Sequence, residues 1–250
     1  MIEPLIEFRD VDFAYGHPRS VPSTCSKTIC DAGVLPAHAA ETAAPQKRGV
    51  HVGQVLSGCN FCLRPGQRVA LLGPNGCGKT TLLHLIVGLL RPTAGQIEVF
   101  GQPRVTEADF HEVRRRVGLL FQDADDQLFC PTVAEDVAFG PLNLGKSRDE
   151  VRRIVASTLD SLGLAGYEHR VTYRLSGGEK RLVALATVLA MQPEVLLFDE
   201  PSGGLDDAST ERLIGVLARL PQAMIVVSHD RAFWEAVTSS VVELKEGRIV

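Results

Sequence analysis

Short apolar runs recur along the chain and have the length of strands that are buried on both faces. Four of them are RVALL, VGLLF, VLLF and AMIVVS, at residues 68–72, 117–121, 195–198 and 223–228. Stretches with helical periodicity lie between them, such as TTLLHLIVGLL at residues 80–90. Buried strands that alternate with helices are typical of a parallel sheet covered by helices. The pattern therefore predicts an α/β fold.

Three regions depart from this alternation. The N-terminal IEFRDVDFAYG indicates a pair of strands that ends at Tyr15, and the C-terminal VVELKEGRIV indicates a hairpin that turns at Glu246–Gly247. Between residues 123 and 178 we expect a mainly helical insertion in the α/β core. Its clearest helix runs over residues 147–164, because Ser147 stands three residues before a glutamate, which is the spacing of a capping box.

A further segment, residues 17–53, is rich in Pro, Ser, Thr and Ala and has no sustained periodicity. Such a composition buries little apolar surface, which predicts a mobile surface insertion. The segment holds four residues of the soft metal-binding types, Cys25, Cys30, His38 and His51. Their spacings match no compact zinc pattern, so the residues favour a disordered loop over a metal site.

Composition narrows the class of protein. The 250 residues, 45% hydrophobic and 22% charged, suit one domain over residues 1–250. A net charge of −4 provides no broad basic surface, which argues against nucleic acid as a partner. The opening MIEPLIEFRD lacks the regions of a signal peptide, and no apolar run reaches the length of a membrane span. We therefore expect a cytosolic chain whose six cysteines are reduced thiols.

A glycine-rich loop follows the first buried strand. It reads GPNGCGKTT, and Gly73, Gly78, Lys79 and Thr80 fill the pattern G-x-x-x-x-G-K-[ST]. In that pattern backbone N–H groups wrap a phosphate, the lysine adds a point charge and the hydroxyl holds magnesium. The alternative is an ordinary glycine turn between a strand and a helix. The predicted nucleotide-binding residues are Gly73, Pro74, Asn75, Gly76, Cys77, Gly78, Lys79, Thr80 and Thr81.

Residues able to do chemistry stand where the other buried strands end. They are Gln122, Asp199, Glu200 and His229. In an open parallel sheet ligands bind outside the carboxyl ends of the strands, so we expect these side chains to meet in one crevice. Taken singly, Gln122 would be a polar residue at the start of a helix, Asp199 an N-cap and His229 a surface histidine. Their coincidence at strand ends favours a site.

A second glycine-rich stretch, LSGGEK, opens another predicted helix. Ser176 and Glu179 have the spacing of a capping box, and Gly177 and Gly178 allow an anion to approach the backbone. One chain needs only one phosphate loop for one nucleotide. We therefore expect a two-fold dimer in which each nucleotide lies between the phosphate loop of one chain and the Ser176 loop of its partner. The alternative is a capped helix and nothing more.

Together these motifs resemble those of ATP-binding-cassette (ABC) ATPases over nearly the whole chain, apart from the insertion after Gly16. The matching residues are Tyr15, GPNGCGKTT, Gln122, LSGGEK, VLLFDEP, SGGLD and SHD. The resemblance implies a P-loop NTPase core with a parallel sheet, an antiparallel N-terminal β region and an inserted helical subdomain at residues 123–178. It also implies ATP hydrolysis, ATP and Mg²⁺ as ligands, and a second ABC ATPase chain, identical or a paralogue, as a partner.

The same resemblance implies a role for each candidate residue. Tyr15 would stack on adenine, Lys79 would contact the β- and γ-phosphates, and Glu200 would polarise the attacking water. The implied Mg²⁺ ligands are Thr80, Gln122 and Asp199. The implied catalytic set is Glu200, His229, which contacts the γ-phosphate, and Gln122. The loop at residues 202–206 would cross the dimer interface, so the residues that act on the partner's nucleotide would be Ser176, Gly177, Gly178 and Asp206.

A narrower resemblance lies in FQDADDQLFCPTVAEDVAFGPLNLG at residues 121–145. It is similar to the ATPase subunits of cobalt and nickel importers, and to those of energy-coupling-factor transporters for vitamins. This implies a transmembrane subunit as a partner and a place at the cytoplasmic face of the cell membrane. The competing hypotheses are a soluble ABC ATPase that acts on ribosomes or DNA, and a module that senses nucleotide without hydrolysis.

Three features depart from the family's usual pattern. Glu179 replaces the more usual glutamine of the signature, and Cys77 stands where serine is common. The sequence ends at Val250, directly after the predicted hairpin, without the extension that helps some relatives to dimerise. This departure leaves the stability of the dimer without nucleotide an open question.

Overall fold

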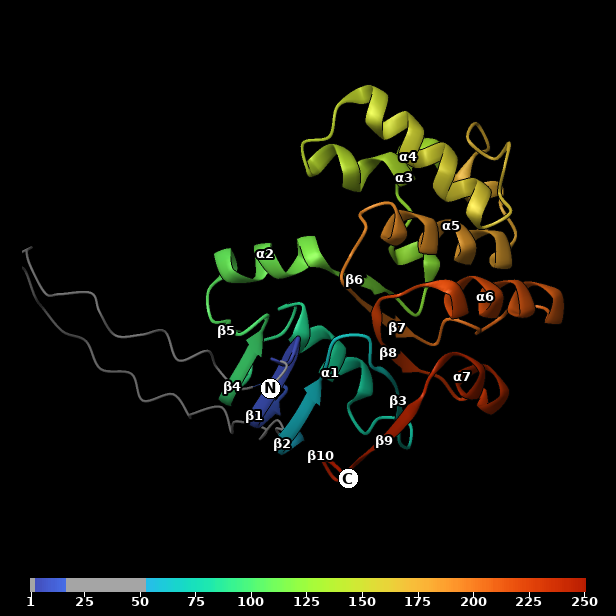
Figure 1. Ribbon diagram of the computed structural model, residues 1–250. Helices are drawn as coiled ribbons and strands as arrows, with labels where there is room; N and C mark the ends of the chain where they lie inside the picture. Colours follow the sequence, from blue (N-terminus) through green and yellow to red (C-terminus); the bar gives the residue numbers. More distant parts are fainter. Residues whose placement is uncertain (1–2, 17–52) are drawn as a thin grey trace, which may run out of the picture.

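The structure, a computed structural model, describes residues 3–16 and 53–250 and contains two β-sheets (Figure 1). The smaller sheet is antiparallel and has the order β2-β1-β4-β5. The larger sheet has the order β10-β9-β3-β8-β7-β6, and its strands pair in parallel except for β10. The strands are β1 (Ile6–Ala14), β2 (Gln54–Leu63), β3 (Arg68–Leu72), β4 (Ala94–Val99), β5 (Gln102–Pro103), β6 (Val117–Leu120), β7 (Val195–Asp199), β8 (Ala223–Val227), β9 (Ser240–Lys245) and β10 (Arg248–Ile249).

The N-terminal stretch forms one strand, so the predicted strand pair is wrong. β1 pairs antiparallel with β2 on one side and with β4 on the other. Its register shifts between Phe8 and Val11, where Asp10 has a φ of 49°. This irregularity interrupts the alternation of buried and exposed side chains, which makes one bulged strand look like two in the sequence. The predicted C-terminal hairpin is present, with Lys245 opposite Arg248.

The helices are α1 (Lys79–Ile86), α2 (Glu107–Arg116), α3 (Val133–Asn143), α4 (Arg148–Ser161), α5 (Gly177–Leu189), α6 (Asp207–Arg219) and α7 (Arg231–Val237), with short 3-10 turns η1 (Ala124–Asp126) and η2 (Thr172–Arg174). In Figure 1, α3 and α4 lie beyond α5, far from the small sheet. Ser147 caps α4 as predicted, since its hydroxyl accepts a hydrogen bond from the backbone of Glu150. In the part of the chain that the structure describes, no helix has the length and apolarity to span a bilayer.

The predicted insertion at residues 17–53, with Cys25, Cys30, His38 and His51, lies outside the described residues except for Gly53. The four described cysteines are free thiols: Cys59, Cys62, Cys77 and Cys130.

The central strands β7 and β8 of the large sheet are buried on both faces, which explains why they are almost continuously apolar. Along β7, Val195 and Leu197 pack in a core shared with the small sheet and α1. Leu196 and Phe198 point to the opposite face and pack in a second core with residues of α3, α4, α5 and α6. Side chains of successive strand residues point to opposite faces, so a strand between two cores is apolar throughout.

Parallel pairing brings the carboxyl ends of the strands to one edge of the sheet. Asp199 stands opposite Val227, and the backbone N–H of Glu200 donates to the Val227 carbonyl at 2.9 Å. Gln122 follows β6. The glycine-rich loop follows β3, the strand that lies between β9 and β8 in the sheet. The segments that carry the candidate residues therefore leave the sheet side by side.

Candidate functional site

The glycine-rich loop between β3 and α1 has a backbone that requires glycine. Gly73 and Gly78 have φ angles of 146° and 110°. A Cβ at Gly73 would lie 2.4 Å from the backbone oxygen of Leu244, and a Cβ at Gly78 would lie 2.6 Å from the side chain of Val55. Larger residues at these two positions would force the loop away from β9 and β2. The loop therefore keeps its shape at the N-terminus of α1, where a helix attracts an anion.

The ammonium group of Lys79 lies against this loop. Its side chain is 8% exposed, and Nζ donates to the carbonyl oxygens of Gly73 at 2.7 Å and Pro74 at 3.0 Å. These partners are neutral, so they orient the ammonium without cancelling its charge. A buried cation that is not neutralised strongly favours an anion beside it.

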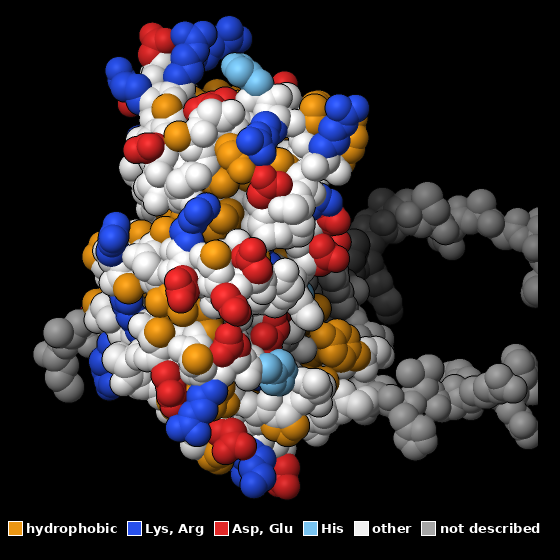
Figure 2. Space-filling view, turned by 90° about the vertical axis from the view of Figure 1, so that its right-hand side faces the viewer, with side chains coloured by type: hydrophobic (Ala, Val, Ile, Leu, Met, Phe, Trp, Pro, Cys, Tyr) orange, Lys and Arg blue, Asp and Glu red, His pale blue; other side chains and the backbone are white. Residues whose placement is uncertain are grey.

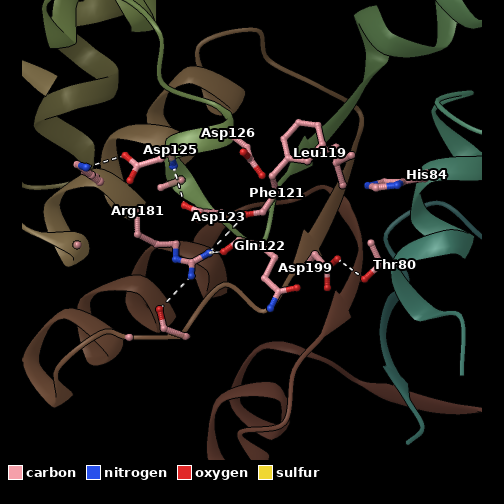
Figure 3. A pocket seen from close by; sticks show the side chains of 15 residues that line it. Thr80, His84, Leu119, Phe121, Gln122, Asp123, Asp125, Asp126, Arg181 and Asp199 are labelled. Carbon is pink, nitrogen blue, oxygen red and sulfur yellow. Dashed lines mark hydrogen bonds and ion pairs between the residues drawn. The ribbon is translucent and has the colours of Figure 1, made fainter. Parts of the chain in front are cut away.

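Oxygen atoms of three predicted metal ligands face the same space. The Thr80 hydroxyl donates to Asp199 Oδ2 at 2.6 Å, and Gln122 lines the same cavity of about 480 Å³. Figure 3 shows the three side chains turned towards one another from α1, the end of β7 and the end of β6. A hydroxyl, an amide and a carboxylate are hard oxygen donors, the ligands that Mg²⁺ prefers. The residues present therefore fit a magnesium ion.

Glu200 presents a buried carboxylate oxygen that lacks a hydrogen bond. Its Oε2 accepts a hydrogen bond from the backbone N–H of His229 at 3.2 Å, and its Oε1 lies 3.4 Å from His229 Nε2. Within the described residues, Oε1 is buried and has no hydrogen-bond partner. Glu200 also has a φ of 49°, in the left-handed region that a residue with a side chain rarely adopts. An unsatisfied carboxylate oxygen held in a cavity is suited to accept a hydrogen bond from a water molecule.

Tyr15 stands at the mouth of this cavity. Its side chain is 52% exposed, and its hydroxyl shares a hydrogen bond of 3.1 Å with Thr81 Oγ1. The ring packs edge-on against Phe13, with centroids 4.9 Å apart. The edge contact and the hydrogen bond orient the ring and leave much of its surface exposed, available for a planar ligand to stack on.

The structure brings most of the predicted single-chain residues into one cavity. Those that line it are Tyr15, Asn75, Gly76, Gly78, Lys79, Thr80, Thr81, Gln122, Asp199, Glu200 and His229. Gly73, Pro74 and Cys77 do not line it. The first two supply the carbonyls that hold Lys79, and Cys77 faces a separate cavity of about 380 Å³ beside the β9–β10 hairpin.

The residues predicted to act on a partner's nucleotide do not line this cavity. Ser176, Gly177 and Gly178 open α5, and Asp206 caps α6 by accepting from the backbone of Ser209 at 2.9 Å. Gly177 lines an adjoining cavity of about 640 Å³ instead. Within one chain Ser176 and Gly178 line neither cavity, whereas Gly177 shares the adjoining one with Thr80, Gln122 and Asp199.

Glu179, the departure in the signature, anchors the Ser176 loop. Its Oε2 accepts from the backbone N–H of Ser176 at 2.8 Å and from the Ser176 hydroxyl at 2.9 Å. Its Oε1 accepts from the hydroxyl of Tyr167 at 2.7 Å and from Arg170 at 3.0 Å. The Tyr167 hydrogen bond, followed by those from Ser176, holds the pKa of Glu179 below its usual value. The carboxylate thus completes the predicted capping box and ties the loop to neighbouring side chains.

Sequence analysis missed Arg181. It belongs to no motif, yet its side chain is only 9% exposed, and it contacts the backbone of both Gln122 and Gly203. The sequence offered one signal of its burial: Arg181 begins the apolar run RLVALATVLA. Residues 182–186, which follow it in the same helix, are all buried. A charge in such a place needs specific polar partners.

These features define the class of site: a glycine-rich loop with a buried lysine, a cluster of hard oxygen donors and a carboxylate with one oxygen that lacks a hydrogen bond. Comparison with known proteins agrees. The ABC transporter family matches residues 56–203. The chain therefore belongs to the ABC transporter ATP-binding family, and it is an ATPase with a P-loop NTPase fold.

Three relatives illustrate the match. The cobalt import ATP-binding protein CbiO of Syntrophus aciditrophicus is 44% identical over 198 residues, 78% of this chain and 71% of the relative. The energy-coupling factor transporter ATP-binding protein EcfA of Methanocaldococcus jannaschii is 44% identical over 200 residues, 78% of this chain and 72% of the relative. The solved structure of CbiO1 from Clostridium perfringens, described as part of the ABC transporter complex CbiONQ, has a TM-score of 0.77 at 28% identity and covers 99% of this chain and 87% of that one.

Proposed function

We propose that this chain is the ATP-hydrolysing subunit of a membrane importer, located at the cytoplasmic face of the cell membrane, with cobalt or nickel ions as the cargo. The observation that carries the proposal is the 44% identity to a cobalt import ATP-binding protein, together with the likeness to a CbiONQ component. An identity of 44% to an energy-coupling factor ATPase favours a vitamin as the second candidate cargo.

The geometry supports a role for each residue around ATP. Tyr15 stacks on the adenine, and Lys79 together with the backbone N–H groups of the loop binds the phosphates. Thr80, Gln122 and Asp199 would hold Mg²⁺ through their oxygen atoms. When bound, the ion would offset the negative charge of the phosphates.

Hydrolysis then requires a water molecule aligned with the γ-phosphate. Glu200 accepts a hydrogen bond from that water through Oε1, the oxygen that has no hydrogen bond among the described residues. His229 lies beside it and contacts the γ-phosphate. Phosphoryl transfer depends mainly on positioning and charge stabilisation, and this arrangement supplies both.

The second glycine-rich loop supports a dimer. Ser176, Gly177, Gly178 and Asp206 are absent from the lining of the Lys79 cavity, while Ser176 stands at a capped helix N-terminus suited to an anion. We assign these residues to the nucleotide of a second ABC chain, identical or a paralogue. ATP then joins two chains, and closure of the dimer drives transport.

An apolar groove supports a transmembrane partner. It has a volume of about 240 Å³ and is lined by residues that include Leu89, Phe129, Phe139 and Met191. Phe129 and Phe139 are 66% and 47% exposed and stack edge to face at 4.8 Å. Apolar side chains gathered around a groove are suited to take a helix of another subunit.

The face drawn in Figure 2 presents no continuous basic surface. Figure 2 shows acidic side chains gathered along the middle of one face, with basic ones mostly towards its upper and lower ends. A protein that binds nucleic acid by its backbone presents a continuous basic surface instead. The net charge of −4 argues in the same direction, against a soluble ABC ATPase that acts on ribosomes or DNA.

The test is to co-express the chain with the transmembrane proteins encoded beside its gene and to reconstitute the purified complex in lipid vesicles. We expect uptake of radioactive cobalt or nickel that requires ATP and is lost in a complex with Lys79→Ala. Uptake of a vitamin with neither metal transported would support the second cargo. An active ATPase that never co-purifies with a transmembrane protein would contradict the importer function.

A further inference from the structure

Arg181 connects two loops of the nucleotide site to the helix that begins at Ser176. It lies in the second turn of α5, and its Nη1 donates to the Gln122 carbonyl at 2.7 Å. Its Nη2 donates to the Gly203 carbonyl at 3.0 Å. Figure 3 shows the guanidinium beside Gln122, on the side away from Thr80. One planar group thus bonds to two loops that are far apart in the sequence.

Both contacts lead directly to the proposed reaction centre. Gln122 is a proposed magnesium ligand. The backbone N–H of Gly203 donates to the carbonyl of Glu200 at 3.1 Å, which ties the second loop to the proposed water-orienting residue. A Cβ at Gly203 would lie 3.3 Å from the Glu200 carbonyl oxygen and 3.4 Å from Arg181 Nη2, so the loop packs tightly against both.

The surroundings explain why an arginine stands here. Burial lowers the pKa of the Arg181 guanidinium, while the carboxylates of Asp123, Glu200 and Asp199 favour its charged form. Arginine presents donors in a rigid planar fork and reaches two carbonyls at once, whereas the ammonium of lysine is a single point. The charge is thus retained inside the protein in the form best suited to hold two loops in register.

We propose that Arg181 is a positioning residue for ATP hydrolysis, one that fixes Gln122 and Glu200 relative to the helix carrying Ser176. The inference rests on the proposed roles of those three residues. Since Ser176 serves the partner's nucleotide in that proposal, Arg181 links the geometry of a chain's own site to the site it shares across the dimer.

The experiment compares Arg181→Met, Arg181→Lys and a matched control, Arg152→Met, which removes an exposed arginine from α4. Turnover and the Mg²⁺ concentration for half-maximal turnover are measured at saturating ATP, with thermal melting alongside. We expect Arg181→Met to lower turnover about tenfold to hundredfold and to raise the Mg²⁺ requirement about tenfold. Arg181→Lys falls between Arg181→Met and the wild type in both measurements, and Arg152→Met resembles the wild type.

Loss of stability alone lowers the active fraction without changing the Mg²⁺ requirement. Equal Mg²⁺ requirements in both Arg181 variants and the wild type would therefore overturn the inference, even if turnover falls with the melting temperature. If Arg181→Met does not fold, the Mg²⁺ requirement of Arg181→Lys alone tests the inference. Gln122→Ala separates the proposed metal ligand from the proposed positioning role of Arg181. An unchanged Mg²⁺ requirement in Gln122→Ala would refute Gln122 as a metal ligand. A changed requirement in Gln122→Ala, with no change in Arg181→Lys or Arg181→Met, would refute the positioning role.

Discussion

Thr80 Oγ1 donates a hydrogen bond of 2.6 Å to Asp199 Oδ2, and this contact joins the start of α1 to the end of β7. The two residues are 119 positions apart in the sequence. The hydrogen bond keeps the oxygen atoms of two proposed magnesium ligands close enough to bind the same ion, so the protein need not rearrange to bring them together. Preorganised oxygen ligands of this kind reduce the cost of binding a metal.

Asp199→Asn tests this cluster. The amide oxygen can still accept from Thr80, but the negative charge that favours Mg²⁺ is gone. We expect Mg²⁺-dependent ATPase activity to fall by about a hundredfold or more, with little change in the melting temperature. Asp160→Asn, on the exposed face of α4, is the control and should behave as wild type. Full activity in Asp199→Asn at low Mg²⁺ would rule out its role as a ligand.

Glu200→Gln tests the group that orients water. Glutamine keeps the size of the side chain but removes the carboxylate whose Oε1 has no hydrogen bond among the described residues. We expect ATP binding to be retained and turnover to fall by about a hundredfold or more. Equilibrium binding of labelled ATP and steady-state hydrolysis measure the two effects. Glu211→Gln, exposed on α6, is the matched control. Near-normal hydrolysis by Glu200→Gln would reject the assignment.

The sequence predicted the parts of this site that depend on local chemistry. The glycine-rich loop before α1, the positions of Gln122 and Asp199 after and at the end of buried strands, and the capping box of Ser176 follow from short-range patterns, and the structure contains all of these features. It did not predict Arg181, because that residue's partners are backbone carbonyls 22 and 59 positions away, which leave no trace in side-chain types. The single bulged β1 was missed because a bulge at Asp10 breaks the two-residue alternation that identifies a strand.

The hydrogen bonds of Glu179 lead us to expect that the stability of the folded state depends on pH. Hydrogen bonds from Tyr167 and Ser176 lower its pKa below the usual 4.5, so the folded state favours the charged form. The contribution to stability is complete above pH 4.5 and is lost as pH falls through the lowered pKa of the folded state. We expect Glu179→Gln to unfold more easily in denaturant at pH 7, by about 1 kcal/mol.

The pH series provides the check on that prediction. The difference in unfolding free energy between wild type and Glu179→Gln should stay constant from pH 7 to about pH 5 and shrink at lower pH. A difference that grows on acidification would show that the carboxylate is not the stabilising group.

Phe129→Glu tests the proposed docking groove. A charge on the exposed Phe129–Phe139 pair should prevent burial against an apolar partner, because an unpaired buried charge is costly. We expect the isolated chain to keep its basal ATPase activity and to lose assembly with the transmembrane subunit in co-purification. Val105→Glu, which also places a charge on an exposed apolar residue, should assemble normally. Unchanged assembly of Phe129→Glu would place the docking surface elsewhere.

The central claim is that the ATP bound at Lys79 is completed by Ser176 of another chain. Two variants test it together: Lys79→Ala removes the charge above the phosphate loop, and Ser176→Arg fills the second loop with a bulky side chain. Each variant alone should be nearly inactive. In a mixed dimer with shared sites, one site carries both defects, while the other combines an intact Lys79 with an intact Ser176.

The decisive measurement is therefore the ATPase rate of a one-to-one mixture, after sedimentation with MgATP has established that mixed dimers form. The account predicts recovery to about a quarter of the wild-type rate, since random pairing puts half of the chains in mixed dimers with one intact site of two. Mixed dimers that form and recover no hydrolysis would contradict the claim that the two loops act on one ATP from different chains.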